Sequence, residues 1–447
     1  MRTKLFYGAG DLGFSTCNSV LGILFAIFLT DVVGLRPGLA ALAVFVGRSW
    51  DYVNDPLIGY LSDRTRSRWG RRRPFLLFGC VPFGLAFAAL WYRPPIPNQL
   101  MLAIYYGAVY LLYDALATLV YMPYYALTPE LTEDYDERTT LTSYRMAFTI
   151  VGGLIAFTVP MAVIGSMRPE NGGRVLAVGA AIGLMSAMGI LATFLGTRER
   201  PRTQKIEQHG LWTSLRAAVA NRPFLFAMGI FLFTWASLEI VQSMLLFFLK
   251  YAMRMEEQSD IIAGTIFVTA LLVLPLWEWV SRRMDKRRAY IAGMVFLSAV
   301  VLVLFAAEPS WGLPTVLALA ALAGVGVSAM HVLPWSIIPD AVEWDELRTG
   351  QRHEGTFYSL VLLLRKVATS IALPLTLLFL EWSGYVSNAD MQAPQAVRAI
   401  KILTGPVPAA LLCIGIAFAA FYPLSRERHA EVRAQLAARR ATIPASE

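Results

Sequence analysis

The chain has few charged residues and very few cysteines. Only 16% of its 447 residues are Asp, Glu, Lys or Arg, whereas 56% are hydrophobic, a composition that does not suit a pair of soluble domains. The three cysteines, Cys17, Cys80 and Cys413, lie far apart and show neither C-x-x-C nor metal-ligand spacing. We interpret them as inert residues of an apolar core.

Motifs of membrane-embedded enzymes are missing as well. The sequence has no H-E-x-x-H or G-x-S-x-G, and its four histidines, His209, His331, His353 and His429, are scattered. His331 alone falls in an apolar stretch, where it either lines a cavity or is a satisfied core residue. We therefore expect neither an enzyme nor a cofactor, while a channel or a non-transporting receptor remains an alternative.

Long apolar stretches, by contrast, recur from end to end, each with roughly the 20 residues that cross a bilayer. The first runs to about Val33 without a small-residue cleavage site, so it is interpreted as a span and not as a signal peptide. Twelve spans are predicted, at 7–33, 38–62, 74–92, 99–126, 140–165, 175–196, 222–249, 260–281, 289–307, 312–338, 355–381 and 402–424. The expected fold is an all-α membrane protein.

A polar segment after the sixth span divides the chain into equal sets of spans. We expect an N-terminal six-helix bundle (1–196), a cytoplasmic linker (197–221), a C-terminal six-helix bundle (222–424) and a cytoplasmic tail (425–447). The segments MPYYALTPE (122–130) and LPWSIIPD (333–340) end corresponding spans and pair prolines with an acid. Such similarity predicts proline-broken helices at matching places in two halves, as in alternating-access transporters.

The net charge of +8 is concentrated in particular loops. Once twelve spans are threaded, the basic residues of the N-terminus, of residues 64–73, 198–205 and 282–288, and of the tail all fall on one side. The positive-inside rule makes that side cytoplasmic, with both termini inside a cell (inner) membrane. Because topology and membrane lipid account for these charges, no nucleic-acid partner is expected.

Ionisable residues inside the second span form the clearest candidate site. Asp51 lies three residues after Arg48, and three and four residues before Asn54 and Asp55, so the four share one helix face. Each ionisable group near mid-membrane costs roughly 2.5–3.5 kcal/mol, which indicates a role for this face. Two carboxylates and an amide favour Na⁺, Li⁺ or a proton, whereas the alternative is a structural ion pair between Arg48 and Asp51.

The fourth span adds a second polar face. Asp114, Thr118, Tyr121 and Tyr125 are spaced by four, three and four residues. Thr118 is expected to donate a hydroxyl ligand to the cation, and Asp114 either enlarges that site or pairs with Arg145 of the fifth span. The alternative is that these groups only bond neighbouring helices.

The eleventh span carries two adjacent cations, Arg365 and Lys366, well inside its apolar run. Adjacent residues point about 100° apart on a helix, so one is expected to face the cavity and the other to snorkel or find an acid. We assign Lys366 to the cavity as a binding residue for an anionic group of the substrate. Glu239 and Glu278 are candidate partners for these cations.

The loop between the second and third spans has six arginines and an acid at its start. Beyond its topogenic role, Asp63, Arg64 and Arg71 are candidate gating residues, forming a latch when the cytoplasmic side closes. The acidic segments 130–137 and 340–346 are its expected counterparts.

Several motifs, taken in order, resemble a known family: YGAGDLG (7–13), TDVVGL (30–35), RSWDYVNDPLIGYLSDRTRSRWGRRRPF (48–75), MPYYALTPEL (122–131), SYRMAF (143–148), PDAVEWDE (339–346) and RHEG (352–355). Across nearly the whole chain, the sequence is similar to the glycoside-pentoside-hexuronide:cation symporters, the melibiose permease-like family of the major facilitator superfamily. The resemblance implies the major facilitator fold and symport. It also implies a sodium site at Asp51, Asn54, Asp55 and Thr118, a cavity arginine at Arg145 and a cavity lysine at Lys366.

The departures from that family concern the substrate. Galactoside-transporting members have aspartates where this chain has Ser15 and Tyr121, and a tryptophan where it has Tyr125. Losing carboxylates that grip sugar hydroxyls makes a galactoside doubtful. Two solutes therefore stay open. The candidate substrate-binding residues are Ser15, Asn18, Asp114, Tyr121, Tyr125, Arg145, His331 and Lys366.

The first solute is a glycoside, pentoside or uronide, whose carboxylate Arg145 or Lys366 would take. The second is a lysophospholipid or another amphiphile, since the family's animal relatives include a sodium-coupled lysophosphatidylcholine symporter. That symporter resembles this chain in the cation site and in the span 11 lysine, and it also lacks the sugar-binding acids. In either case the partners are a small solute and a monovalent cation.

Overall fold

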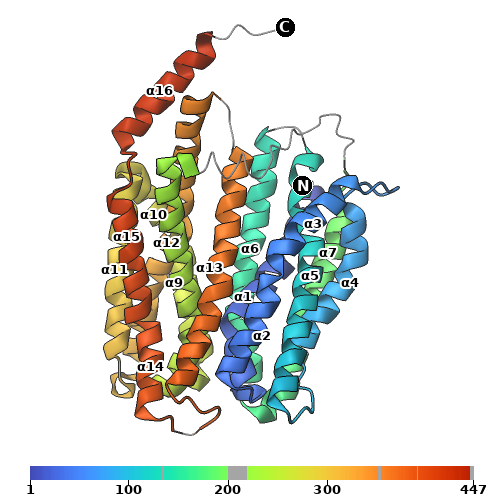
Figure 1. Cartoon of the computed structure of the whole chain (residues 1–447), viewed down its shortest axis with the longest axis vertical. Helices are drawn as coiled ribbons and strands as arrows, with labels where there is room; N and C mark the ends of the chain where they lie inside the picture. Colours follow the sequence, from blue (N-terminus) through green and yellow to red (C-terminus); the bar gives the residue numbers. More distant parts are fainter. Residues whose placement is uncertain (133–134, 200–218, 351–353, 390, 443–447) are drawn as a thin grey trace. The chain divides into compact units, whose positions relative to one another are not determined.

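Every regular element in the described part of the computed structural model is helical (Figure 1); the described residues are 1–447 without 133–134, 200–218, 351–353, 390 and 443–447. Up to the linker the elements are α1 (Arg2–Ile27), the π-helix η1 (Phe28–Val32), α2 (Pro37–Ser49), α3 (Asp51–Arg64), α4 (Arg73–Leu90), α5 (Gln99–Leu131), α6 (Tyr135–Ile164), the 3₁₀-helix η2 (Pro169–Asn171) and α7 (Gly172–Gly196).

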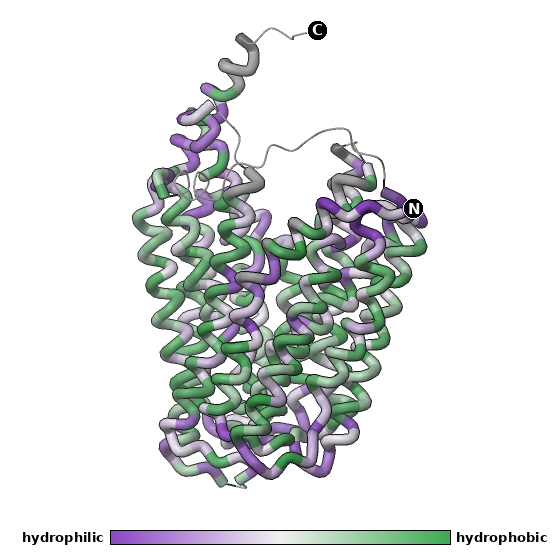
Figure 2. Tube along the Cα trace, turned by 45° about the vertical axis from the view of Figure 1, so that its right-hand side comes forward, coloured by the Kyte–Doolittle hydropathy of each residue, from purple (hydrophilic) through white to green (hydrophobic). Residues whose placement is uncertain are grey.

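After the linker follow α9 (Arg222–Phe247), the π-helix η3 (Phe248–Ala252), η4 (Glu256–Gln258), α10 (Ser259–Arg283), α11 (Lys286–Ala306), η5 (Pro309–Trp311), α12 (Gly312–Thr349), α13 (Glu354–Trp382), α14 (Pro394–Thr404), α15 (Pro406–Ala420) and α16 (Arg426–Thr442). Figure 2 shows hydrophobic residues along most of the helices, with hydrophilic residues gathered at helix ends and on α16. The prediction of an all-α membrane fold is confirmed.

Eleven helices in the described ranges are long and apolar enough to cross a membrane. The predicted second span, 38–62, is not among them because it is divided at Trp50 into α2 and α3. With 13 and 14 residues, α2 and α3 are each too short to qualify alone, and the charged and polar side chains of α3 make it hydrophilic as well. The predicted twelfth span, 402–424, begins earlier, at Pro394, and consists of α14 and α15 with a break at Gly405.

The proline-rich segments do not break their helices, contrary to the prediction. The helix α12 continues through Pro334 and Pro339, and α5 continues through the corresponding segment 122–130. A proline removes one backbone hydrogen bond, but neighbouring helices and side chains can hold such a helix together within a membrane protein. The observed interruption lies instead at Trp50, directly before Asp51.

The chain divides into two compact units, which are described separately. Unit 1 contains Met1–Gln204, Gln242–Gly264 and Ser370–Ile400, and unit 2 contains Lys205–Val241, Thr265–Thr369 and Lys401–Glu447. The predicted bundles 1–196 and 222–424 stay a prediction. Most of the predicted linker, and the beginning of the RHEG motif, lie outside the described residues.

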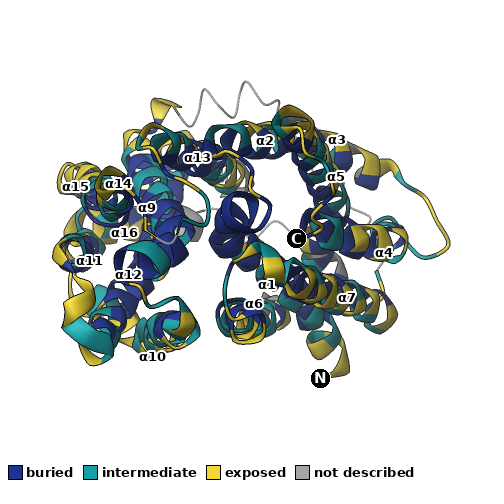
Figure 3. Ribbon diagram, turned by 90° about the horizontal axis from the view of Figure 1, so that it is seen from below, coloured by how far each residue is buried: buried dark blue, intermediate teal, exposed yellow. Residues whose placement is uncertain are grey.

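In unit 1, α1 packs against α6 and α7, and α4 packs against α5 and α7. A β-carbon on Gly84 of α4 would lie 2.7 Å from the backbone oxygen of Gly183 in α7, so only small residues permit this approach. Exposed apolar residues follow one side of α4 and one side of α7, every three or four positions, as expected for surfaces that face lipid (Figure 3). They are Phe78, Val81 and Leu85 of α4, and Leu184, Met188, Leu191 and Leu195 of α7.

In unit 2, α11 packs against α12 and α15 around an apolar cluster. Tyr290 is fully buried in this cluster, and its hydroxyl is 2.7 Å from that of Thr234 in α9. Lys286 at the start of α11 forms an ion pair with Asp340 of α12, with 2.7 Å between Nζ and Oδ1. This pair connects the ends of two helices that belong to the same half of the sequence.

Candidate functional site

The four predicted cation-site residues lie together in unit 1, where α3 meets α5. Thr118 Oγ1 is 3.2 Å from Asp51 Oδ1 and 3.2 Å from Asp55 Oδ1. Asn54 is buried in the same contact and donates its Nδ2 hydrogen to the backbone oxygen of Ala115 at 3.3 Å. Helical spacing therefore predicted correctly which side chains share this face, and folding places Thr118 beside both carboxylates.

This geometry concentrates negative charge around one hydroxyl group. A hydroxyl has a single proton to donate, and two neighbouring carboxylates repel each other unless positive charge lies close to them. All the oxygen atoms offered are hard donors, which suit Na⁺ better than a transition metal. Among the described residues no three His, Cys, Asp or Glu side chains lie close enough to hold a metal ion. Two acids with hydroxyl and amide groups therefore suit a monovalent cation.

The break between α2 and α3 lies at the same place. Trp50 separates the two helices directly before Asp51, and the Arg48 side chain donates from Nε to the Tyr110 hydroxyl at 3.0 Å. Trp50 itself keeps right-handed helical dihedrals, and its carbonyl oxygen accepts the Asn54 N–H at 3.0 Å. The interruption is therefore confined to this one residue, next to the acidic face.

Three substrate-binding candidates lie side by side along α1 and α5. Asn18 donates from Nδ2 to the Tyr121 hydroxyl at 3.2 Å, and the Tyr121 ring stacks on Tyr125 with 5.9 Å between ring centroids. Phe14 packs against Tyr121 with 3.4 Å between centroids. The result is an aromatic surface with amide and hydroxyl groups, suited to a sugar face or to an alkyl chain with a polar end.

The other unit 1 candidates have different surroundings. Ser15 bonds the backbone of its own helix at 3.1 Å, and Asp114 is buried one turn before Thr118 on α5. The guanidinium of Arg145 lies over the Tyr125 ring, 5.0 Å from its centroid. Arg145 thus joins the aromatic surface, as a cavity arginine would.

The two remaining candidates, His331 of α12 and Lys366 of α13, belong to unit 2. His331 is exposed, its Nδ1 lies 2.9 Å from the backbone oxygen of Val327, and its ring packs against Trp235 with 5.7 Å between centroids. Both interpretations, cavity lining and a satisfied histidine, stay open. Lys366 is half-buried. The adjacent Arg365 stacks on Trp235, with its guanidinium carbon 4.9 Å from the ring centroid. The assignment of Lys366 to the cavity stays a prediction.

Comparison with known proteins agrees with these features. The family profile described as MFS/sugar transport protein matches residues 6–426. An uncharacterized symporter of Synechocystis is 33% identical, over 98% of this chain and 96% of its own length. The chain belongs to this transporter family.

Other relatives of this MFS transporter have named solutes. A sphingosine-1-phosphate transporter of Mus musculus is 31% identical over 98% of this chain and 92% of its own. A sodium-dependent lysophosphatidylcholine symporter of Danio rerio is 27% identical over 95% and 86%. The fold of the present chain is similar to that of a D-xylose-proton symporter, with a TM-score of 0.67 and 17% identity over 94% of this chain and 96% of the symporter. These findings make the protein a multi-pass membrane transporter and not an enzyme, as expected.

The structure of this protein also shows a further candidate binding residue, Asp11, which was not predicted from the sequence. Asp11 is buried in α1, one turn before Ser15, and accepts hydrogen bonds from the Tyr125 hydroxyl at 3.1 Å and from the Thr149 hydroxyl. The chain thus has a carboxylate on the same side of α1 as Ser15, one turn away from the aspartate position of galactoside transporters. The signal available in the sequence was an acid inside an apolar span.

Changing Asp11 to Asn should alter the affinities for neutral and for anionic solutes differently. A neutral sugar that uses this carboxylate as an acceptor should lose about 1.5–3 kcal/mol, roughly 10- to 100-fold in affinity. An anionic solute should bind at least as tightly to the variant, because the negative charge of the Asp11 carboxylate, which repels such a solute, has been removed. Competition binding measures both, with Tyr125→Phe as the control that removes one hydroxyl and keeps the ring. Equal losses for both solutes, together with a low yield of folded protein, would mean that Asp11 is only structural.

The predicted latch loop has a partner that the sequence analysis missed. Glu199, just after α7, accepts hydrogen bonds from the backbone N–H groups of Arg71 at 2.6 Å and of Arg72 and Arg73, each at 2.8 Å. These N–H groups belong to the start of α4, where an anion is favoured by the helix dipole. Glu199 lies within the predicted linker (197–221), and only folding brings it to this loop.

The expected acidic counterparts of the loop have other contacts or undescribed side chains. Asp340 and Glu343 in unit 2 contact Lys286 and His429, at 2.7 Å and 2.8 Å. The side chains of Asp63 and Glu130 lie outside the described residues. A gating role for Asp63, Arg64 and Arg71 therefore stays a prediction.

Proposed function

We propose that this protein is a sodium-coupled symporter that carries a lysophospholipid or another phosphate-bearing amphiphile with one long chain, by alternating access in the cell membrane. The observation that supports coupling is the approach of Thr118 Oγ1 to both Asp51 and Asp55, at 3.2 Å each. A site of two carboxylates, a hydroxyl and an amide offers hard oxygen ligands to one monovalent cation. Proton coupling through either carboxylate is the alternative for the ion.

The choice of solute is supported by charge and by relatives. In unit 1, Arg145 offers positive charge for a phosphate, next to the apolar surface that Phe14, Tyr121 and Tyr125 offer to an alkyl chain. Lys366 is the second cation that the sequence predicts for the anionic group. Relatives that match at least 95% of this chain are a lysophosphatidylcholine symporter and a sphingosine-1-phosphate transporter. Both of those solutes combine a phosphate with one long chain.

A glycoside or uronide is the second candidate. Asp11 supplies a buried carboxylate next to Tyr125, and a carboxylate is the group with which sugar transporters of the resembling glycoside-pentoside-hexuronide family hold hydroxyls. The matching family profile is also described as sugar transport. In this case Arg145 or Lys366 would bind the uronate.

Uptake into liposomes that contain the purified protein tests both candidates. Lysophosphatidylcholine, sphingosine-1-phosphate, a glucuronide and a galactoside are offered in turn, with an inward Na⁺ gradient, an inward proton gradient or neither. We expect Na⁺-stimulated accumulation of a phosphate-bearing amphiphile. Accumulation of the sugars alone would disprove the proposal that the solute is an amphiphile. Uptake at the same rate with and without the cation gradients would disprove symport.

A further inference from the structure

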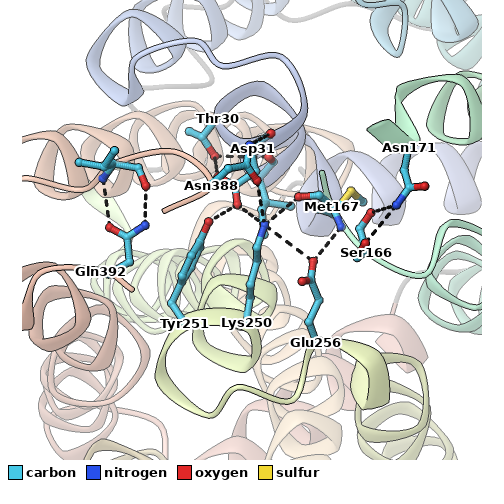
Figure 4. Close-up of polar contacts among 12 residues, drawn as sticks. Thr30, Asp31, Ser166, Met167, Asn171, Lys250, Tyr251, Glu256, Asn388 and Gln392 are labelled. Carbon is cyan, nitrogen blue, oxygen red and sulfur yellow. Dashed lines mark hydrogen bonds and ion pairs between the residues drawn. The ribbon is translucent and has the colours of Figure 1, made fainter. Parts of the chain in front are cut away.

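A buried polar cluster lies at the end of α1 that is farthest from the N-terminus (Figure 4). Asp31 of η1 is fully buried, and its carboxylate forms an ion pair with Lys250 of η3, with 2.5 Å between Oδ2 and Nζ. The hydroxyl groups of Tyr251 and Tyr385 also donate to this carboxylate. The Asn388 amide donates to the Asp31 backbone oxygen. All five residues belong to unit 1.

Lys250 also connects this cluster to the segment between α6 and η2. Its Nζ donates to the Met167 backbone oxygen, between α6 and η2, at 2.7 Å and to Asn388 Oδ1 at 3.3 Å. Glu256 lies 3.8 Å from the same Nζ and accepts the Met167 N–H at 2.7 Å. One cation thus holds together segments before and after the linker, including pairs 219 residues apart.

The two charged partners occupy corresponding places in the two halves of the sequence. The helices α1 and α9 open the two predicted six-span sets, and each ends in a five-residue π-helix, FLTDV (Phe28–Val32) and FLKYA (Phe248–Ala252). Such π-turns are rare and are frequently found at functional sites. Asp31 comes from the first and Lys250 from the second, so the ion pair joins two equivalent helix ends.

Stability alone does not account for this arrangement. A buried ion pair usually stabilises a fold no more than apolar side chains of the same size would, whereas removing one partner is strongly unfavourable. Lys250 is 9% exposed and Asp31 not at all, so water screens the attraction between the two charges very little. A contact of this kind suits an element that changes between two states.

We propose that Asp31 and Lys250, with Tyr251, Tyr385 and Asn388, form the outer gate of this transporter. The basic loops place the N-terminus in the cytoplasm, so this end of α1 faces outside. When the ion pair is formed, it holds η1 and η3 together and closes this end of unit 1 to the outside. The pair breaks each time the solute site opens outward, and this proposal does not depend on which solute is carried.

A cysteine behind the gate tests this without any solute. Gly22 of α1 is buried, and a β-carbon there would meet only the Gln242 side chain of α9, at an ordinary 3.5 Å. Gly22→Cys therefore serves as the probe. The native Cys17, Cys80 and Cys413 are replaced by alanine. A membrane-impermeant maleimide is then added to right-side-out vesicles, and the labelling rate is followed. Lys250→Met and Asp31→Asn should each raise that rate about tenfold or more by populating the outward-open state.

Two further variants keep the test decisive. Tyr385→Phe removes one hydrogen bond to Asp31 and keeps the ring that packs on Phe247, so a smaller, few-fold rise is expected even if the charge variants fold poorly. Lys286→Met breaks the Lys286–Asp340 pair, which is of similar length but lies in unit 2, and should leave the labelling rate unchanged. An unchanged rate in well-folded Lys250→Met and Tyr385→Phe, or an equal rise in Lys286→Met, would overturn the gate.

Discussion

Replacing Asp55 by Asn should abolish Na⁺-driven accumulation of the solute while the protein still inserts and folds. At an effective dielectric constant of about 20, a carboxylate about 2.4 Å from a cation contributes roughly 7 kcal/mol of Coulomb energy, most of which dehydration of the ion offsets. A net loss of only about 2 kcal/mol weakens cation binding about 30-fold. Asparagine keeps the size of the side chain and the contact with Thr118, so the effect reports on charge.

Uptake into liposomes under an inward Na⁺ gradient measures this effect, and counterflow without a gradient measures transport that needs no accumulation. Glu308→Gln is the matched control, because Glu308 is an exposed acid in a loop and its substitution also removes one charge. Undiminished accumulation in Asp55→Asn would disprove the proposed cation site. Loss in both variants would point to a general effect of charge on insertion.

Replacing Lys366 by Ala should weaken the binding of an anionic solute by about 1.5–3 kcal/mol, the usual contribution of a charge-assisted contact. This is roughly a 10- to 100-fold loss for a phosphate-bearing lipid or a uronide. A neutral sugar should lose much less, since it has no charge to pair with the ammonium group. Titration of each solute against the purified protein gives the three affinities.

Lys366→Arg separates a substrate contact from a structural role. It keeps the positive charge and should recover most of the affinity for a phosphate, which guanidinium and ammonium groups both bind. If Lys366→Ala instead lowers the folded yield and leaves the affinity for every charged solute unchanged, the lysine is a structural partner of an acid such as Glu239. The assignment of Lys366 to the solute would then be wrong.

Periodicity was sufficient to predict the cation-site candidates. Asp51, Asn54 and Asp55 share a face whatever the rest of the fold does, because a helix repeats every 3.6 residues. The cost of ionisable groups in a membrane then indicated that this face looks inward. The interruption at Trp50 was not predicted. The prolines of α5 and α12 predicted breaks in those two helices, which remain continuous.

By itself the sequence determined the membrane environment, the helical class and the acidic face of α3, because each depends on residues within one or two turns of each other. The tertiary structure alone decided which distant groups meet. Asp31 and Lys250, Glu199 and the start of α4, and Asp11 and Thr149 are each more than 100 residues apart. A charged residue inside an apolar span indicates that it has a polar partner, but many polar residues of the sequence could be that partner. Only the packing of the helices determines which one it is.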